Sequence, residues 1–359
     1  MSIRSWVGWP GAPLAILSAA LFGASTPLAK LLLGGGLSPW LLAGLLYLGS
    51  GIGLAAIMAG RRLVRHPTRE APLGRRDGGW MALVVLSGGV AGPLLLMLGL
   101  TTTPASSAAL LLNLEGLATM TIAWGVFHEN VDRRLMLGAL AILAGAVILS
   151  WQGGGGSGGL GIGALAIAGA CLAWGIDNNL TRKVSGSDPV QIAMIKGLAA
   201  GTVNLGLAFA LGGHLPAGSL TLATGAVGFV GYGVSLVLFV LALRFLGTAR
   251  TGAYFSTAPF IGALLALALF GEAVTLPLVL AASLMGIGLW LHLVERHDHD
   301  HVHEPIDHVH AHSHDQHHRH RHGPNDPPGE PHVHAHVHRR LAHSHPHYPD
   351  LHHRHDHAG

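Results

Sequence analysis

The chain contains a series of apolar runs, each about 20 residues long, from which Asp, Glu, Lys and Arg are almost absent. A run of about 20 apolar residues is the length that an α-helix needs to cross the hydrocarbon core of a bilayer. Half of all residues are hydrophobic and only 11% are charged, whereas a soluble protein of this size exposes many more charged side chains. The sequence therefore predicts an all-α polytopic membrane protein.

Ten transmembrane spans can be placed along the chain, and they fall into two groups of five. The connections between most of them are short, and a polar tail without an apolar run follows the last one. We therefore expect a first repeat in residues 1–151, a second in residues 160–294 and a tail in residues 295–359. The predicted spans are 12–33, 38–60, 80–100, 104–127, 134–151, 160–181, 189–211, 220–243, 249–271 and 274–294.

The distribution of basic residues predicts the orientation of these spans. Loops rich in Lys and Arg face the cytoplasm, and the loops at 34–37, 101–103, 152–159, 212–219 and 272–273 contain neither residue. We expect both termini to be cytoplasmic and the protein to lie in the cell (inner) membrane, with the lipid bilayer as a partner. The basic residues of the opposite loops are Arg61, Arg62, Arg65, Arg69, Arg75, Arg76, Arg133, Arg134, Arg182, Lys183, Arg244 and Arg250.

The second half of the chain repeats the first. The stretch CLAWGIDNNLTRKV (171–184) matches LFGASTPLAKL (21–31), and a second alignment sets Glu129 on Glu272. Each half contains an odd number of spans, so the two copies must have opposite orientations in the membrane. Inverted repeats of this kind are typical of secondary transporters, in which one half rocks against the other around a central site.

Several short motifs occur in a recognisable order. The sixth span ends in W-G…L-x-R (174–182), and a D-P pair opens the seventh (188–189). The ninth span contains an A-P pair (258–259) and ends in L-F-x-E-A-V (269–274). Together with the ten spans, these motifs resemble the EamA-type family of the drug/metabolite transporter superfamily over residues 12–294. The resemblance implies two inverted five-helix repeats, a central cavity and a small solute such as an amino acid, a nucleotide precursor or a drug.

The sixth span is unusual because it ends with Asp177, Asn178 and Asn179. A carboxylate inside a helix bundle costs at least about 3 kcal/mol on insertion scales unless it is paired or hydrated. We expect Asp177 to bind a cation, take up a proton or pair with a base. The alternative is a residue near the cytoplasmic face that only caps the helix or pairs with Thr181 or the basic residues that follow.

Two further charged residues lie well inside predicted spans, away from the span ends. Glu115 lies midway along the fourth, and Lys196 about one-third of the way into the seventh. Lys196 is suited to neutralise either carboxylate or to bind an anionic substrate group; alternatively, Glu115 is a protonated hydrogen-bonding residue and Lys196 reaches toward the surface. We assign no catalytic residue. The candidate substrate-binding or ion-coupling residues are Glu115, Asp177, Asn178, Asn179, Lys196, Asn113 and Asn204.

The tail is rich in histidine, since 23 of the 27 histidines lie from His297 onward, many of them in H-x-H runs. Neutral imidazole is a common ligand of Zn, Ni, Co and Cu(II). Interspersed prolines and the lack of helical spacing predict a disordered tail that binds divalent metal in several stoichiometries. We expect no required cofactor, and the only bound metal that we expect is the divalent metal held by the tail. The candidate metal ligands are His297, His299, His301, His303, His308, His310, His312, His314, His332, His334, His336 and His338.

Composition and motifs favour a transporter over an enzyme. The sequence has neither a zinc-protease H-E-x-x-H nor a P-loop G-x-x-x-x-G-K-[ST], and we expect no nucleic-acid partner. The favoured interpretation is a secondary transporter that works by alternating access and exports a divalent transition metal (Ni, Co or Zn) with help from the tail. Alternatives are export of a metabolite, amino acid or drug with an incidental metal-binding tail, and a membrane-anchored metal buffer or sensor. A homodimer is one possible assembly.

Overall fold

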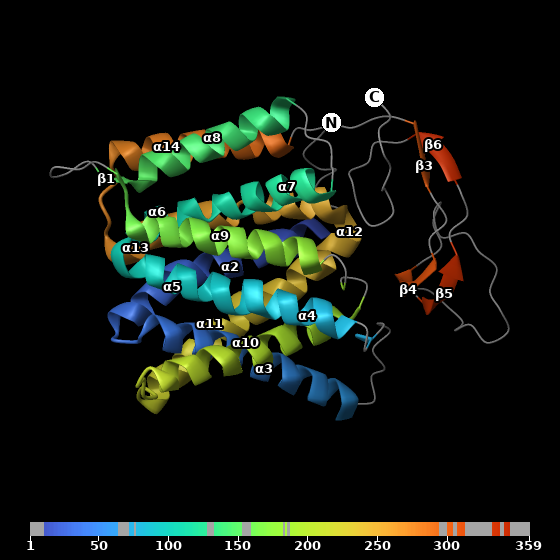
Figure 1. Cartoon of the computed structure of the whole chain (residues 1–359), viewed down its shortest axis with the longest axis horizontal. Helices are drawn as coiled ribbons and strands as arrows, with labels where there is room; N and C mark the ends of the chain where they lie inside the picture. Colours follow the sequence, from blue (N-terminus) through green and yellow to red (C-terminus); the bar gives the residue numbers. More distant parts are fainter. Residues whose placement is uncertain are drawn as a thin grey trace.

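The computed structural model describes residues 11–63, 72–74, 77–127, 133–152, 159–181, 184, 187–293 and four short segments of the tail. The helices run side by side in one bundle (Figure 1). The first half contains α2 (Gly11–Gly34), α3 (Pro39–Leu63), α4 (Gly78–Val84), the π-helix η2 (Val85–Ala91), α5 (Gly92–Thr102), α6 (Ala105–Leu111), α7 (Asn113–Phe127) and α8 (Arg133–Ser150). The second half contains α9 (Ile162–Thr181), α10 (Pro189–Ala210), α11 (Gly218–Gly228), the π-helix η3 (Phe229–Val234), α12 (Ser235–Phe255), α13 (Ala258–Phe270) and α14 (Leu276–Leu293).

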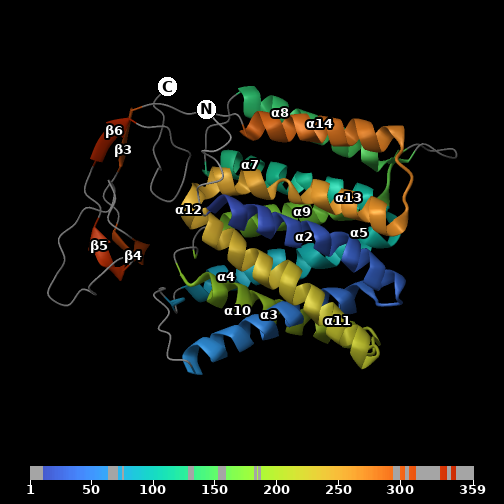
Figure 2. The same ribbon diagram turned by 180° about the vertical axis from the view of Figure 1, so that it is seen from behind.

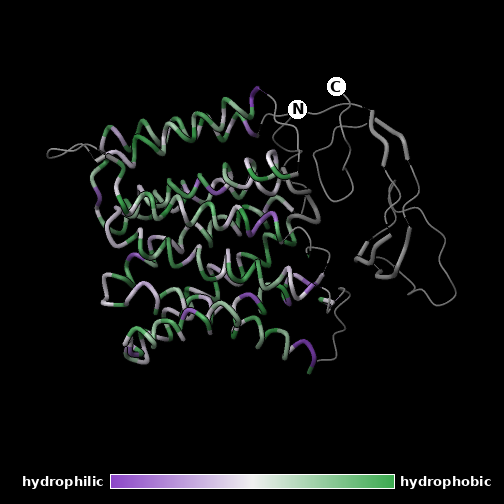
Figure 3. Tube along the Cα trace, in the orientation of Figure 1, coloured by the Kyte–Doolittle hydropathy of each residue, from purple (hydrophilic) through white to green (hydrophobic). Residues whose placement is uncertain are grey.

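The predicted fold class is confirmed, because the bundle is all-helical and apolar along most of its length (Figure 3). Within the described residues, seven helices are long and apolar enough to cross a membrane, and two shorter apolar helices cover 258–270 and 276–292. Helix α9 is also long enough, at 20 residues. It falls outside that set because the polar residues of its last turns, Asp177, Asn178 and Asn179, lower its hydropathy.

The eighth and ninth predicted spans differ from the observed helices. We expected a connection at residues 244–248, but the chain is helical from α11 through η3 to the end of α12, and it breaks only at 256–257. Pro259, in the first turn of α13, explains the position of the break, because a proline cannot continue a preceding helix. The helix of the fourth span breaks at Leu112, between α6 and α7. In the alignment that sets Glu129 on Glu272, Leu112 corresponds to Phe255, the last residue of α12.

Each helix of one half packs against the other half in the same way as its counterpart packs against the first. Helix α2 packs along α12 and α13, and its counterpart α9 packs along α5 and α7. The remaining equivalent helices pack on each other, α3 on α10 and α8 on α14. Figures 1 and 2 show these two pairs at opposite edges of the bundle, with α2 and α9 between them. Such an exchange of contacts is typical of repeats related by a twofold axis in the membrane plane.

Glycines allow α3 and α10 to approach each other closely. A Cβ atom built on Gly197 would lie 2.6 Å from the backbone nitrogen of Gly51, and one built on Gly201 would lie 2.5 Å from that of Leu48. Small residues at such positions let helix backbones approach in a membrane. The Gly197-x-x-x-Gly201 pattern therefore serves helix packing.

Among its described residues, the tail forms short antiparallel pairs of strands. Strand β3 (Asp300–His303) pairs with β6 (Leu341–Ser344), and β4 (Asp307–His312) pairs with β5 (His332–Val337). We expected no regular structure here. Alternating β-branched residues such as those in H-V-H segments favour the extended backbone that these strands adopt. In the membrane domain, β1 (Trp151–Gln152) pairs with β2 (Gly159–Leu160) between the two halves.

The close approach of α3 and α10 gives a testable prediction. We expect Gly197→Ala to lower the free energy of unfolding by about 1–3 kcal/mol, because a methyl group inserted into a packed contact forces backbone shifts. Gly206→Ala on the same helix is the matched control, since nothing lies within 4 Å of its Cβ position. Thermal unfolding of the purified protein in detergent should show a loss for the first variant and none for the second. Equal stability of the two variants would contradict this packing.

Candidate functional site

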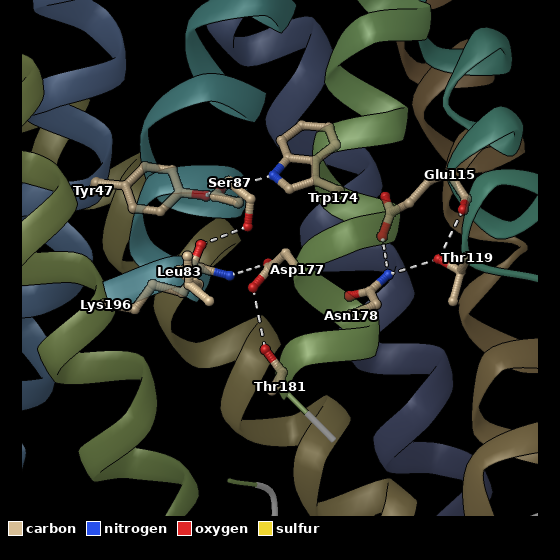
Figure 4. A network of polar contacts seen from close by, with 11 residues as sticks. Tyr47, Leu83, Ser87, Glu115, Thr119, Trp174, Asp177, Asn178, Thr181 and Lys196 are labelled. Atoms are coloured by element: carbon tan, nitrogen blue, oxygen red, sulfur yellow. Dashed lines mark hydrogen bonds and ion pairs between the residues drawn. The ribbon is translucent and has the colours of Figure 1, made fainter. Parts of the chain in front are cut away.

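A network of polar side chains lies inside the bundle where α9 meets α10 and α7 (Figure 4). Its centre is an ion pair between Lys196 on α10 and Asp177 on α9. The two side chains are only 11% and 5% exposed. The hydroxyl of Thr181, one turn along α9, donates to Asp177 Oδ1 at 3.1 Å. Lys196 thus neutralises Asp177, as one of our alternatives expected, and Asp177 also binds Thr181.

The second carboxylate of the network pairs with an amide. Asn178 Nδ2 donates to Glu115 Oε1 at 3.0 Å and to the hydroxyl of Thr119 at 3.2 Å. Asn179 turns its own Nδ2 toward the carbonyl oxygens of Gly175 at 2.8 Å and Thr119 at 3.1 Å. These contacts join α9 to α7, so the polar end of α9 bonds to a helix on each side. Glu115 is partly exposed, whereas Asp177 is buried.

The π-helix η2 carries the backbone groups that complete the site. Pro93 has no N–H, so the bond to the carbonyl five residues earlier, that of Gly88, cannot form in this π-helix. Side chains from three other helices supply donors instead. The Gly88 oxygen accepts from Tyr47 Oη at 2.8 Å and from Trp174 Nε1 at 2.9 Å. The Gly89 oxygen accepts from Asn204 Nδ2 at 3.0 Å.

The same segment packs directly on the ion pair. A Cβ atom at Gly88 would lie 2.0 Å from Asp177 Oδ2, so only glycine permits this approach. The second π-helix, η3, occupies the equivalent place in the other half, because the Glu129–Glu272 alignment sets residues 85–91 on 228–234. π-Segments inside helices occur frequently at functional sites. The paired placement indicates that both halves keep this irregular turn beside the centre of the bundle.

Aromatic rings from both halves meet next to the network. The ring of Phe22 lies 6.3 Å from that of Trp174, 5.9 Å from that of Tyr232 and 5.2 Å from that of Phe255, between centroids. Tyr47 lies 5.3 Å from Tyr232. Among the described residues, the buried Tyr232 hydroxyl has no hydrogen-bond partner. The centre of the bundle therefore combines an ion pair, amides and an aromatic cluster.

The structure gathers most of the candidate residues, but not all of them. Asp177, Asn178, Asn179, Lys196 and Glu115 lie in the network, and Asn204 binds η2 beside it. Asn113 is directed elsewhere: its Nδ2 donates to the Leu110 oxygen at 2.8 Å and to Met285 Sδ at 3.7 Å.

Sequence reasoning did not select Tyr47 or Trp174. Tyr47 is an ordinary aromatic residue in an apolar span, and Trp174 entered the analysis only as part of the W-G motif of the sixth span. A buried tyrosine or tryptophan needs a partner for its polar atom, and the Gly88 carbonyl provides it for both residues.

The predicted metal ligands of the tail are described only in part. His297, His299, His314 and His338 lie outside the described residues. In the parts of the chain that the structure describes, no group of three or more His, Cys, Asp or Glu side chains is arranged to hold a metal ion. The described backbone places the others in strands: His301 and His303 in β3, His308, His310 and His312 in β4, and His332, His334 and His336 in β5.

Comparison with known proteins agrees with this architecture. A curated relative from Methanothermobacter thermautotrophicus, described as an uncharacterized transporter, is 30% identical over 214 residues, which are 58% of this chain and 62% of that protein. The probable 4-amino-4-deoxy-L-arabinose-phosphoundecaprenol flippase subunit ArnE of Klebsiella pneumoniae is 35% identical over 94 residues, 25% of this chain and 83% of its own length. A solved crystal structure shares the fold, with a TM-score of 0.57 and 22% identity over 78% of this chain and 95% of that one.

The model of the EamA-like transporter family matches both halves of the chain, at residues 9–151 and 161–294. The chain therefore belongs to the EamA-like transporter family, whose members are membrane transporters and not enzymes.

Proposed function

We propose that the chain moves a small solute across the cell membrane by alternating access, and that solute or coupling ion acts at the network around Asp177 and Lys196. One observation carries this proposal: a buried ion pair lies inside the membrane domain, between α9 and α10. Ionisable residues within membrane spans are costly and commonly mark substrate or ion pathways.

The position of the pair supports this role. Asp177 and Lys196 belong to the second half, whereas Gly88 of η2 and Glu115 of α7 belong to the first and border the same network. When inverted halves rock against each other, groups at their interface change partners. We propose that Asp177 or Glu115 is the proton-coupling or cation-binding carboxylate and that Lys196 supplies the counter-charge.

The chemistry of the network favours a small organic solute with a charged or polar group. Asp177 binds the ammonium group of Lys196, and Glu115 binds the amide of Asn178. An ammonium or amide group of a solute can therefore replace these side chains at the two carboxylates. The aromatic cluster of Phe22, Trp174 and Tyr232 would contact an apolar part of such a solute. A bare divalent ion would instead have to displace Lys196 from its only carboxylate partner among the described residues.

Metal efflux assisted by the tail is the second candidate, and the register of the tail strands favours it. In the β4–β5 pair, His308 is opposite His336, His310 opposite His334 and His312 opposite His332. Directly opposed residues are the closest neighbours across two antiparallel strands, and imidazole binds Zn, Ni, Co and Cu(II). On this proposal the tail is cytoplasmic, as the basic loops predict, and collects metal near the transport path. A tail that only buffers metal, and a homodimer, remain further proposals.

The ion pair gives the test of the main proposal. Asp177→Asn and Lys196→Met should each lower the free energy of unfolding by about 3–5 kcal/mol, because each leaves a buried charge without its partner. The double variant should recover most of this stability, since neutral residues of similar shape replace the pair. Its transport should nevertheless stay at the level of cells without the protein.

Accumulation of ethidium, of labelled amino acids and of radioactive nickel in cells provides the transport assay for the intact chain and the double variant. The intact chain should change the accumulation of at least one of these probes. A double variant that is stable and transports as well as the intact chain would contradict the assignment of the pair.

A chain that ends at Arg296 tests the metal proposal. Cells that express the full chain should contain less Ni, Co or Zn after metal challenge than cells without it, and truncation should remove part of this difference. Elemental analysis of washed cells measures it. Higher metal that disappears on truncation would indicate buffering, and equal metal in all three strains would leave the organic solute.

A further inference from the structure

A second polar cluster lies far from the ion pair, at the end of the bundle where α5, α6 and α13 meet (left in Figure 1). Glu272, which follows α13 in the second half, reaches the start of α6 in the first. Its Oε1 accepts the backbone N–H of Ala105 at 2.7 Å, and its Oε2 accepts the N–H of Ser106 at 3.0 Å and the Ser106 hydroxyl. One carboxylate therefore joins the two halves at this end.

The local sequence explains why Glu272 takes this position. Gly271 ends α13 in the left-handed conformation, at φ 59°, which a residue with a Cβ atom adopts at a cost. The chain reverses there, so the next side chain leaves the axis of its own helix. The first N–H groups of α6 have no partner within the helix, and a negative charge complements the dipole at that helix end.

A basic residue binds the other side of the same turn. Lys30 Nζ of α2 donates to the carbonyl oxygens of Thr103, at 2.9 Å, and Leu100 at the end of α5. Its positive charge complements the negative end of the α5 dipole. The turn between spans three and four is thus held by a cation at one helix end and an anion at the next.

Close helix packing lies just inside this cluster. Ala109, one turn into α6, is 1% exposed, and a Cβ atom at Gly262 of α13 would lie 3.1 Å from its Cβ. Helices α6 and α13 are therefore in tight contact inward of Glu272. Helix α2 packs against α13 deeper in the bundle, where a Cβ atom at Gly23 would lie 2.3 Å from the oxygen of Ala258, the first residue of α13.

We propose that Glu272 is a latch that holds this end of the transporter closed and that must open during the transport cycle, while Lys30 holds the turn to which Glu272 binds. The inference rests on the proposed alternating access, because rocking of the halves separates α13 from α6 at the end that opens. Glu272 is then a positioning residue: it binds no solute, and it sets the balance between the closed and open states.

The chain offers a direct accessibility test. Cys171 is its single cysteine and is buried, so Cys171→Ser gives a background without thiols. Ala109→Cys then reports opening beneath the latch through its reaction with a membrane-impermeant maleimide. Leu215→Cys, in an exposed loop of the same end (58% exposed), identifies whether intact cells or inverted vesicles present this end to the reagent.

We expect Glu272→Gln to raise the labelling rate at position 109 by about tenfold, because it removes charge-assisted hydrogen bonds that favour the closed state. Lys30→Met should act in the same direction. Asp77→Asn is the matched control: Asp77 accepts the N–H of Gly74 at 2.8 Å in an exposed turn near the start of α4, and its loss should leave the rate unchanged.

A second reporter, Ala193→Cys near the start of α10 and 2% exposed, separates a latch from a structural cap. Loss of the latch should raise labelling at 109 and not at 193, whereas general loosening would raise both. Unchanged labelling at 109, or a parallel rise at 193, would overturn the latch. If Glu272→Gln raises labelling at position 109 but the intact chain transports none of the probes, the latch stands and the proposed function fails. If Glu272→Gln leaves labelling at position 109 unchanged while the Asp177–Lys196 double variant has lost transport, the proposed function stands and the latch fails.

Discussion

The hydrocarbon core of a bilayer contains no water to bond a charge or a free carbonyl, and this constraint organises the centre of the molecule. The carboxylate of Asp177 pairs with Lys196, and the Gly88 and Gly89 oxygens of η2 accept hydrogen bonds from Tyr47, Trp174 and Asn204. All of these partners come from other helices. The polar groups that are costliest in lipid therefore also hold α3, η2, α9 and α10 in one arrangement.

The duplicated architecture gives this arrangement its functional meaning. Each half contributes a π-segment at the same place, and equivalent helices exchange contacts across the centre. A structure with this internal symmetry can adopt a second state by exchanging the roles of its halves. The hydrogen bond from Asn178 to Glu115 beside the ion pair and the contacts of Glu272 at one end each join the two halves through a carboxylate.

Much of this structure follows from the sequence, and the limits have physical causes. Apolar runs predicted ten helices because lipid selects for length and hydropathy, and the buried Asp177 predicted a partner because charge must be neutralised. Hydropathy does not mark where a helix bends, so the continuation of α12 to Phe255 was missed. Helical spacing places Asn113 and Glu115 on different faces, and in the structure Asn113 contacts Met285 whereas Glu115 lies in the network.

The account depends on the two halves moving in opposite senses at the two ends of the bundle. Pulsed electron paramagnetic resonance measures this with two pairs of spin labels in the Cys171→Ser background, Thr101 with Leu215 at the Glu272 end and Leu63 with Trp290 at the other. All four positions are exposed. The account predicts two distances for each pair, with conditions that lengthen one pair shortening the other. A single unchanging distance at both ends, or distances that lengthen together, would contradict alternating access.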